Sequence, residues 1–411
     1  MDALSAAAAL ITLAALFSWL NHKFINQPRS IALLLFSLLL SVVLVVLGKL
    51  GLDSWHLDKL ATAAFRLDKV LLDSMLSFLL FAGALHADLR ELARRKWAIA
   101  FLASLAVLVS AVLAGAALWL IFGLLGRPVP FIWCLVFGAL ISPTDPISVL
   151  AILKKANTEK SLVGKLGGEA LLNDGAGVVL FVLFLGIAMR GETVTLAHVG
   201  ALFAREVLGG ALLGLALGYA CYRMLASVNA YQVEILLTLA LVMGGYTLAL
   251  ALHVSGPIAM VVAGLLIGHG RKYAMSPTSR ERLDIFWELL DEILNAVLFV
   301  MIGLELLRLN FNMTYAWAAA FAIPAVLAAR FLSVGLARFV PGLRQDFPPY
   351  VIGILTWGGL RGGISVALAL SLPSGPHRPA IITVTYVVVL FSILVQGLTL
   401  SRVLRRRASP R

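Results

Sequence analysis

The chain has 411 residues, of which 61% are hydrophobic and only 13% are charged. Soluble globular domains carry about a quarter charged residues, so this composition excludes that class and predicts a polytopic helical membrane protein. The formal net charge is +12, and the basic residues lie in short loops between apolar runs. There they set the topology of the chain in the membrane, so no nucleic-acid partner is expected. The two cysteines, Cys134 and Cys221, provide neither a disulfide framework nor a zinc site.

Apolar runs long enough to cross a bilayer, which takes about 17–25 residues, follow one another along the whole chain. We expect an all-α fold with about thirteen of them. The first is interpreted as a retained helix rather than a signal peptide, because it lacks a clear cleavage site. The expected limits are 4–20, 31–48, 70–87, 98–122, 132–153, 165–188, 202–225, 233–252, 256–269, 292–308, 315–339, 350–372 and 380–403.

Loop charges predict the orientation of these spans. The loops that follow the odd-numbered spans carry most of the lysines and arginines, whereas the opposite loops have fewer and balance several of them with acids. The positive-inside rule then places the N-terminus outside and the C-terminus in the cytoplasm. The mixed segment Ser276–Glu292 is expected to form an amphipathic helix on the cytoplasmic surface before span ten.

Span five, "FGALISPTDPISVLAIL", contains an interruption. Pro143 and Pro146 lie three residues apart inside it and should break the helix. One interpretation is a simple kink in which Asp145 caps the second half-helix. Because Ser142 and Thr144 accompany that carboxylate, we favour a functional break, which is tolerated at membrane depth only where it is buried in protein or lines a cavity.

Span twelve, "ILTWGGLRGGISVALAL", has a second weak point, where four glycines surround Arg361. Spans five and twelve are each next to last in a half of six spans, if span seven is a linker. Paired interruptions in corresponding positions predict two inverted six-helix repeats and a transporter whose site lies near the midplane.

Span six, "GEALLNDGAGVVLFVLFLGIA", carries two acids that are costly inside a bilayer. Glu169 and Asn173 are four residues apart and share a helix face, while Asp174 lies about 100° further round. A buried arginine needs a carboxylate at this depth, and Arg361 is the obvious cation. We therefore predict a structural ion pair between Glu169 and Arg361. Arg330 in span eleven is a second intramembrane cation without an assigned role.

This pairing leaves Asp174 to work with Asp145. A small hard cation such as Na⁺ takes oxygen ligands, which Asp174, Asp145, Thr144 and Ser142 could supply together. Cation binding requires the ionised carboxylate and protonation expels the cation, so a site that faces each side in turn would exchange one for the other. The alternative role for Asp174 is structural: a buried polar contact that holds span six against span five without binding an ion. No cofactor is expected.

Four segments together resemble the bacterial branch of the monovalent cation:proton antiporter-1 family, the sodium/proton exchangers. They are "GALISPTDPISVL", "GEALLNDGAGVVLF", "VLFVMIGLEL" and "LTWGGLRGGISVALALSLP", and they occur in this order over nearly the whole chain. The resemblance implies thirteen spans, inverted repeats, a homodimer and a location in the inner membrane. It also implies one transporter unit, 1–411, in which a core (98–188 and 315–403) moves against a dimerisation scaffold (1–97 and 202–308).

The resemblance extends to single residues of the site. It makes Asp174 the carboxylate shared by cation and proton, with Asn173 before it, and adds Asp145 and Thr144 from the interrupted span. Asparagine at position 173 is similar to the electroneutral branch, which exchanges one cation for one proton.

The acid five residues before that key Asp corresponds to Glu169. In the family it pairs with the arginine that corresponds to Arg361. Asn295 falls where eukaryotic relatives have a glutamate, and its role is left open.

The alternatives differ in substrate or in class. Exchange of K⁺ for H⁺ could use the same fold in place of Na⁺ or Li⁺, because the sequence does not reveal the ion. A cation channel would need a continuous pore, which fits paired helix breaks less well. An enzyme is not expected, because a His-Glu-x-x-His or Gly-x-Ser-x-Gly signature is absent from the sequence.

Overall fold

The computed structural model describes residues 3–49, 68–87, 96–145, 160–190, 196–308 and 312–408. Every regular element in these ranges is helical. The first half contains α1 (Ala3–Leu20), α2 (Arg29–Lys49), α4 (Asp68–His86), α6 (Lys96–Phe101), α7 (Val107–Leu124), α8 (Phe131–Ile141), α10 (Lys160–Arg190) and α11 (Leu196–Leu225). The second half contains α12 (Tyr231–Ala251), α13 (Gly256–Ala274), α14 (Pro277–Leu304), α15 (Met313–Gly335), α16 (Pro349–Gly358), α17 (Gly363–Leu370), α18 (Arg378–Phe391) and α19 (Gly397–Ala408).

Short π-helical or 3₁₀-helical segments extend several of these helices. Wide π-type turns follow α1, join α6 to α7 and join α18 to α19, and 3₁₀ turns follow α14 and α15. Their limits are Asn21–Ile25, Leu102–Ala106, Ser392–Gln396, Glu305–Arg308 and Leu336–Phe339.

Within the described ranges, eight helices are long and apolar enough to cross a membrane, and the bent pair α16 and α17 makes a ninth if it counts as one span. This indicates a polytopic membrane protein. The other four predicted spans correspond to α4, α8, α13 and α14, which are not both long and apolar enough over their described residues. For span five the reason is partly that residues 146–153 lie outside the described part. The count of thirteen stays a prediction.

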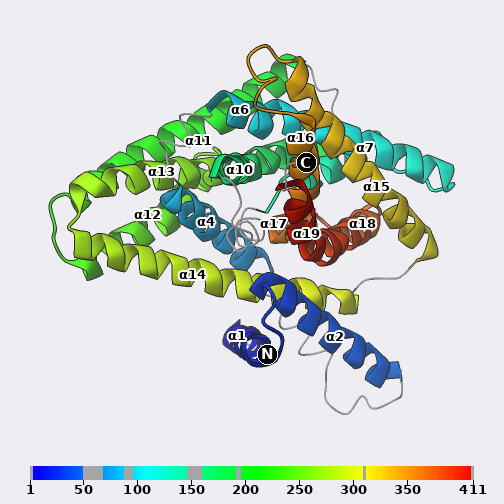
Figure 1. The fold of residues 1–411 in the computed structure, drawn as a ribbon, viewed down its shortest axis with the longest axis horizontal. Coiled ribbons are helices and arrows are strands. Elements are labelled where there is room, and N and C mark those ends of the chain that lie inside the picture. Colours follow the sequence, from blue (N-terminus) through cyan, green and yellow to red (C-terminus); the bar gives the residue numbers. More distant parts are fainter. Residues whose placement is uncertain are drawn as a thin grey trace.

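The described helices form two groups (Figure 1). In one, α11 packs on α13, α13 on α4, and α14 on α2. In the other, α7 packs on α8 and α15, α15 on α18, and α10 on α8. Helix α10 also contacts α11 and α13, and α14 contacts α17, so the two groups meet along α10 and α17.

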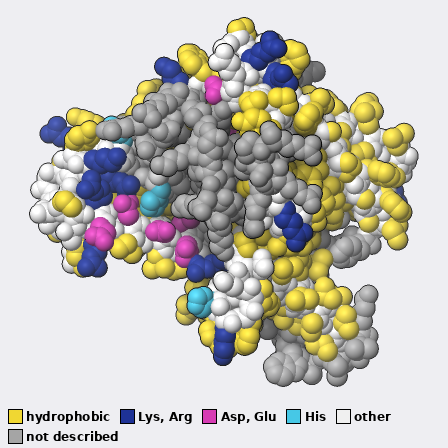
Figure 2. All heavy atoms as spheres, viewed as in Figure 1, with side chains coloured by type: hydrophobic (Ala, Val, Ile, Leu, Met, Phe, Trp, Pro, Cys, Tyr) yellow, Lys and Arg dark blue, Asp and Glu magenta, His cyan; other side chains and the backbone are white. Residues whose placement is uncertain are grey.

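Small residues allow the close approach of α7 and α8. A Cβ atom added to Gly138 would lie 1.9 Å from the backbone oxygen of Ala111, which is far inside contact distance. Glycine at this position therefore brings the two backbones together, as is common in membrane helix pairs. The outer surface is instead apolar, with exposed side chains such as Leu212 and Leu208 on α11, and hydrophobic side chains cover wide areas of the face in Figure 2.

Helix α14 differs from its prediction. Ser276 caps it by accepting a hydrogen bond from the Ser279 backbone N–H at 3.2 Å, and Pro277 is the first helical residue. The helix then runs without interruption to Leu304. The segment 276–292 is thus not a separate element before span ten, because its mixed polarity does not interrupt the helix.

Candidate functional site

The helix of span five breaks where its first proline predicts. Helix α8 ends at Ile141, and the Ser142 hydroxyl donates back to the Gly138 carbonyl at 2.7 Å. The segment 142–145 that follows is not helical, and its side chains from Ser142 to Asp145 are buried. Pro146 and the predicted second half-helix lie outside the described residues. A non-helical backbone thus lies inside the protein, where its polar groups need partners.

The second interruption lies in α16 and α17. Helix α16 ends at Gly358 and α17 begins at Gly363, with a bend of 50° between them. The backbone N–H of Asp145 donates to the carbonyl of Leu360 at 2.7 Å. A Cβ on Gly362 would lie 2.5 Å from the Cβ of Asp145, so only glycine permits this approach. The two breaks, more than 200 residues apart in the chain, therefore contact each other directly.

Asn173 on α10 holds the first break in place. Its Nδ2 donates to Thr144 Oγ1 at 2.8 Å, and its Oδ1 accepts from the Thr144 backbone N–H at 3.3 Å. The side chain is fully buried. Further along α10, a Cβ on Gly177 would lie 2.0 Å from Cγ of Pro143, so this helix packs tightly on the break. Asn173 thus satisfies a backbone donor that the missing helix leaves free.

Asp174 lies beside this asparagine and is 2% exposed. Among the residues that the structure describes, its carboxyl group makes no hydrogen bond or ion pair, and the charge on Asp145 repels it. A buried, ionised carboxylate without a partner is strongly unfavourable. Asp174 therefore needs a proton or a bound cation, and Asp145 and Thr144 bring further oxygen atoms to the same break.

Glu169 pairs with Arg330 of α15 rather than with Arg361, so the predicted ion pair has the wrong partner. Both side chains of the observed pair are 1% exposed. A Cβ on Gly359 would lie 3.0 Å from Arg330 Nε, which places this arginine against the second break. The pair thus connects α10, α15 and the break in one place.

Arg361 instead serves the first break. Its Nη1 donates to the carbonyl oxygens of Ser142 and Pro143, the latter at 3.0 Å, and its backbone N–H donates to Ser392 Oγ at 2.8 Å. These carbonyls lie just past the C-terminal end of α8, where the helix dipole favours a positive charge. The break therefore supplies the hydrogen-bond acceptors for Arg361, and Glu169 acts on it only through its charge, without direct contact.

A family model described as "Sodium/hydrogen exchanger, transmembrane" matches residues 10–406. The chain belongs to the sodium/hydrogen exchanger family. A Na⁺/H⁺ antiporter of Pseudomonas aeruginosa, NhaP, is 49% identical over 407 residues, covering 97% of this chain and 96% of that protein. The Na⁺/H⁺ antiporter NhaH of Halobacillus dabanensis is 33% identical and covers 93% of both chains.

A solved structure supports the fold of this exchanger-family chain. The sodium proton antiporter MjNhaP1 of Methanocaldococcus jannaschii matches with a TM-score of 0.79 and covers 98% of each chain. Its sequence is 18% identical, so the likeness concerns the fold.

Two features of the site were outside the reach of sequence reasoning. The sequence identifies Arg330 as an intramembrane cation, but its spacing along α15 does not reveal which helix it faces. Asn295, whose role was left open, is 8% exposed and donates from Nδ2 to the Asp291 carbonyl at 2.8 Å. It therefore lies inside the protein on α14, one helical turn after an acid.

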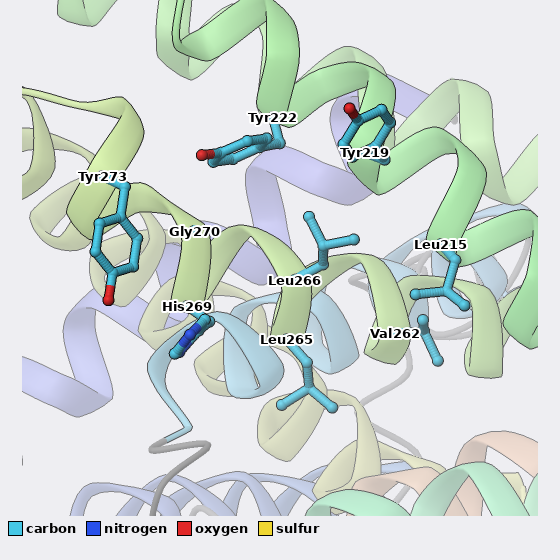
Figure 3. Close-up of a pocket in the computed structure, with 9 residues that line it drawn as sticks. All are labelled: Leu215, Tyr219, Tyr222, Val262, Leu265, Leu266, His269, Gly270 and Tyr273. Carbon is cyan, nitrogen blue, oxygen red and sulfur yellow. The ribbon is translucent and has the colours of Figure 1, made fainter.

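A separate groove of about 530 Å³ lies between α11 and α13, away from the breaks (Figure 3). Two tyrosines of α11 and His269 and Tyr273 of α13 are among the residues that line it, and the others are apolar or glycine. Its lining contains no carboxylate, so it lacks the ligands that a small cation needs. The lining residues are Leu215, Tyr219, Tyr222, Val262, Leu265, Leu266, His269, Gly270 and Tyr273.

Proposed function

We propose that this chain is a secondary transporter that exchanges Na⁺, or Li⁺, for H⁺ by alternating access. The observation that carries the proposal is Asp174, a deeply buried carboxylate without a protein partner in the described part of the chain, beside two contacting helix breaks. The family and the names of the relatives support the same function. Such a transporter is not an enzyme.

The mechanism is competition for one carboxyl group. In its ionised form Asp174 binds the cation, with Asp145, Thr144 and Ser142 as further oxygen ligands. Protonation of Asp174 removes the charge that holds the cation, which then leaves. The site can turn from one side of the membrane to the other only when Asp174 carries either a cation or a proton. The ionised carboxylate alone is too costly to bury during this change. This condition couples the two fluxes.

The residues around the carboxylates keep the breaks in shape. Asn173 holds Thr144 by two hydrogen bonds, so the loop presents its oxygen atoms in a fixed arrangement. Arg361 holds the carbonyls of Ser142 and Pro143, and the pair of Glu169 and Arg330 braces the other break. These groups are positioning residues rather than ligands of the ion.

Asparagine at position 173 supports an electroneutral exchange. A second titrating acid at this place would carry an additional proton, whereas Asn173 stays neutral and bonds to Thr144. Asp174 then moves one Na⁺ in one direction and one H⁺ in the other, without net charge.

The two packing groups support a division into moving and static parts. The core would be 98–188 and 315–403, with both breaks in it, and the scaffold would be 1–97 and 202–308. We further propose thirteen spans in two inverted repeats, a homodimer, and a position in the inner membrane with the N-terminus outside and the C-terminus cytoplasmic. The basic loops after the odd-numbered spans support this orientation.

The alternative substrate is K⁺ on the same fold. The relatives that match along almost the whole chain are named Na⁺/H⁺ antiporters, which favours Na⁺. A channel is less favoured, because the two helix breaks contact each other directly through their backbones beside Asp174.

The test is cation-driven proton movement in proteoliposomes that contain the purified protein. We expect Na⁺ or Li⁺ to dissipate an imposed pH gradient, K⁺ to have little effect, and the rate to stay the same when the membrane potential is clamped to different values. If only K⁺ drives exchange, the transported cation is K⁺ rather than Na⁺ or Li⁺. A rate that follows the membrane potential would overturn the electroneutral stoichiometry.

A further inference from the structure

Acidic side chains follow one face of α14. Glu281, Asp284, Glu288 and Asp291 are spaced by three or four residues, and Asn295 continues the row into the protein. Figure 2 shows acidic side chains gathered along this helix on the face in view. The row begins at the end of α14 that the basic loops assign to the cytoplasm. It therefore leads from that side toward the site.

Part of the acidic charge of α14 is neutralised within the protein. Arg271 forms an ion pair with Asp284, and His86 Nε2 lies 3.7 Å from the same carboxylate. The neighbouring Glu292 pairs with Arg29 of α2. Asp291 has Asn295 as its polar partner, and no basic side chain of the described residues pairs with it, as is also the case for Glu281 and Glu288 further out. Its charge is thus uncompensated.

Asp291 lies close to the breaks. Leu298 of α14 occupies the space that a Cβ on Gly363 would need, 2.1 Å away, so α14 passes directly beside the start of α17. Asp291 precedes Leu298 by seven residues, about 10 Å along a helix. The charges of Asp145 and Asp291 repel each other. Asp291 is partly exposed whereas Asp145 is buried, so of these two carboxylates Asp291 is the one that solvent ions can reach.

We propose that Asp291 is a docking carboxylate that draws monovalent cations from the cytoplasmic side toward Asp145 and Asp174. The inference rests on the proposed function and adds a residue that acts before binding. A single carboxylate holds a monovalent ion weakly, so the ion can move on. An uncompensated charge at the entrance of a low-dielectric site raises the local cation concentration and the rate of association.

This role differs from a structural one in what a substitution changes. A charge that attracts the cation affects the apparent KM, and its influence falls as added salt screens it. Substitution of a residue that only supports the fold of α14 would change stability or kcat, and this change would not depend on ionic strength. The effect should also appear only when Na⁺ is offered on the side to which Asp291 opens.

The experiment compares wild type, Asp291→Asn and Asp291→Glu in proteoliposomes of defined orientation, with Na⁺ varied at low and high choline chloride. For Asp291→Asn we expect a rise in the apparent KM for cytoplasmic Na⁺ of roughly three- to tenfold at low ionic strength, an unchanged kcat, and a smaller effect at high ionic strength. Asp291→Glu should keep the wild-type KM. Glu281→Gln, the same charge change ten residues or about 15 Å further out, should have little effect.

An unchanged KM in Asp291→Asn, or a loss of kcat that salt does not alter, would overturn the docking role while the exchanger itself stands. A wild-type protein that shows no cation-driven proton movement would overturn the proposed function, and this inference with it. Thermal unfolding of each variant in detergent separates a folding defect from either result.

Discussion

Asp174→Asn abolishes exchange while the protein keeps its fold. Asparagine has nearly the same shape but can neither release a proton nor balance the charge of a cation, so both half-reactions stop. We expect sodium-driven proton movement to fall to the rate of liposomes without protein, because neither the proton nor the cation can then be carried. The measurement is the initial rate of pH change in proteoliposomes with matched protein content.

The same substitution makes a prediction about stability. Asp174 makes no hydrogen bond or ion pair in the described residues, so its replacement by asparagine breaks none and removes the repulsion from the nearby Asp145. The melting temperature of Asp174→Asn should therefore equal or exceed that of wild type, because a costly ionisable group is removed. A variant that exchanges at the wild-type rate with normal folding would contradict the role of Asp174.

Arg330→Met destabilises the protein by about 3–5 kcal/mol, because it leaves Glu169 buried without its counter-ion. Glu169→Gln should cost a similar amount for the converse reason. The double variant removes both charges and should regain most of the loss, since replacing a whole buried pair is often close to neutral. Thermal and denaturant unfolding in detergent measure these differences.

Arg361 provides the matched control for this cycle. Arg361→Met should also destabilise the protein, because the carbonyls of Ser142 and Pro143 lose their donor. Adding Glu169→Gln to Arg361→Met should bring much less recovery than adding it to Arg330→Met, because Glu169 contacts Arg330 directly and Arg361 only through its charge. Coupling of Glu169 to Arg361 instead of Arg330 would contradict the observed ion pair.

The breaks and their glycines were predictable because proline and glycine act through local backbone physics. Pro143 cannot continue a helix, and α8 ends two residues before it. The glycines around Arg361 mark the bend between α16 and α17. A broken helix also leaves a backbone N–H that needs an acceptor, but that Asn173 supplies it to Thr144 is a tertiary contact, which local backbone physics does not give.

The partner of Glu169 was not predictable because sequence periodicity gives the face of a helix but not its neighbour. Arg361 was the more conspicuous cation, yet the carbonyl acceptors created by the break take its donors. The continuity of α14 was missed for another reason. Its first half is rich in charge, which ends an apolar run but does not end a helix.

The most direct test of a shared carboxyl group is the dependence of Na⁺ binding on pH. If Asp174 binds either a proton or the cation, the apparent affinity for Na⁺ should be constant at high pH. Below the pKa of the site it should fall by about tenfold for each pH unit, with one proton released per ion bound. An affinity for Na⁺ that does not change with pH, or binding without proton release, would contradict competition at one site.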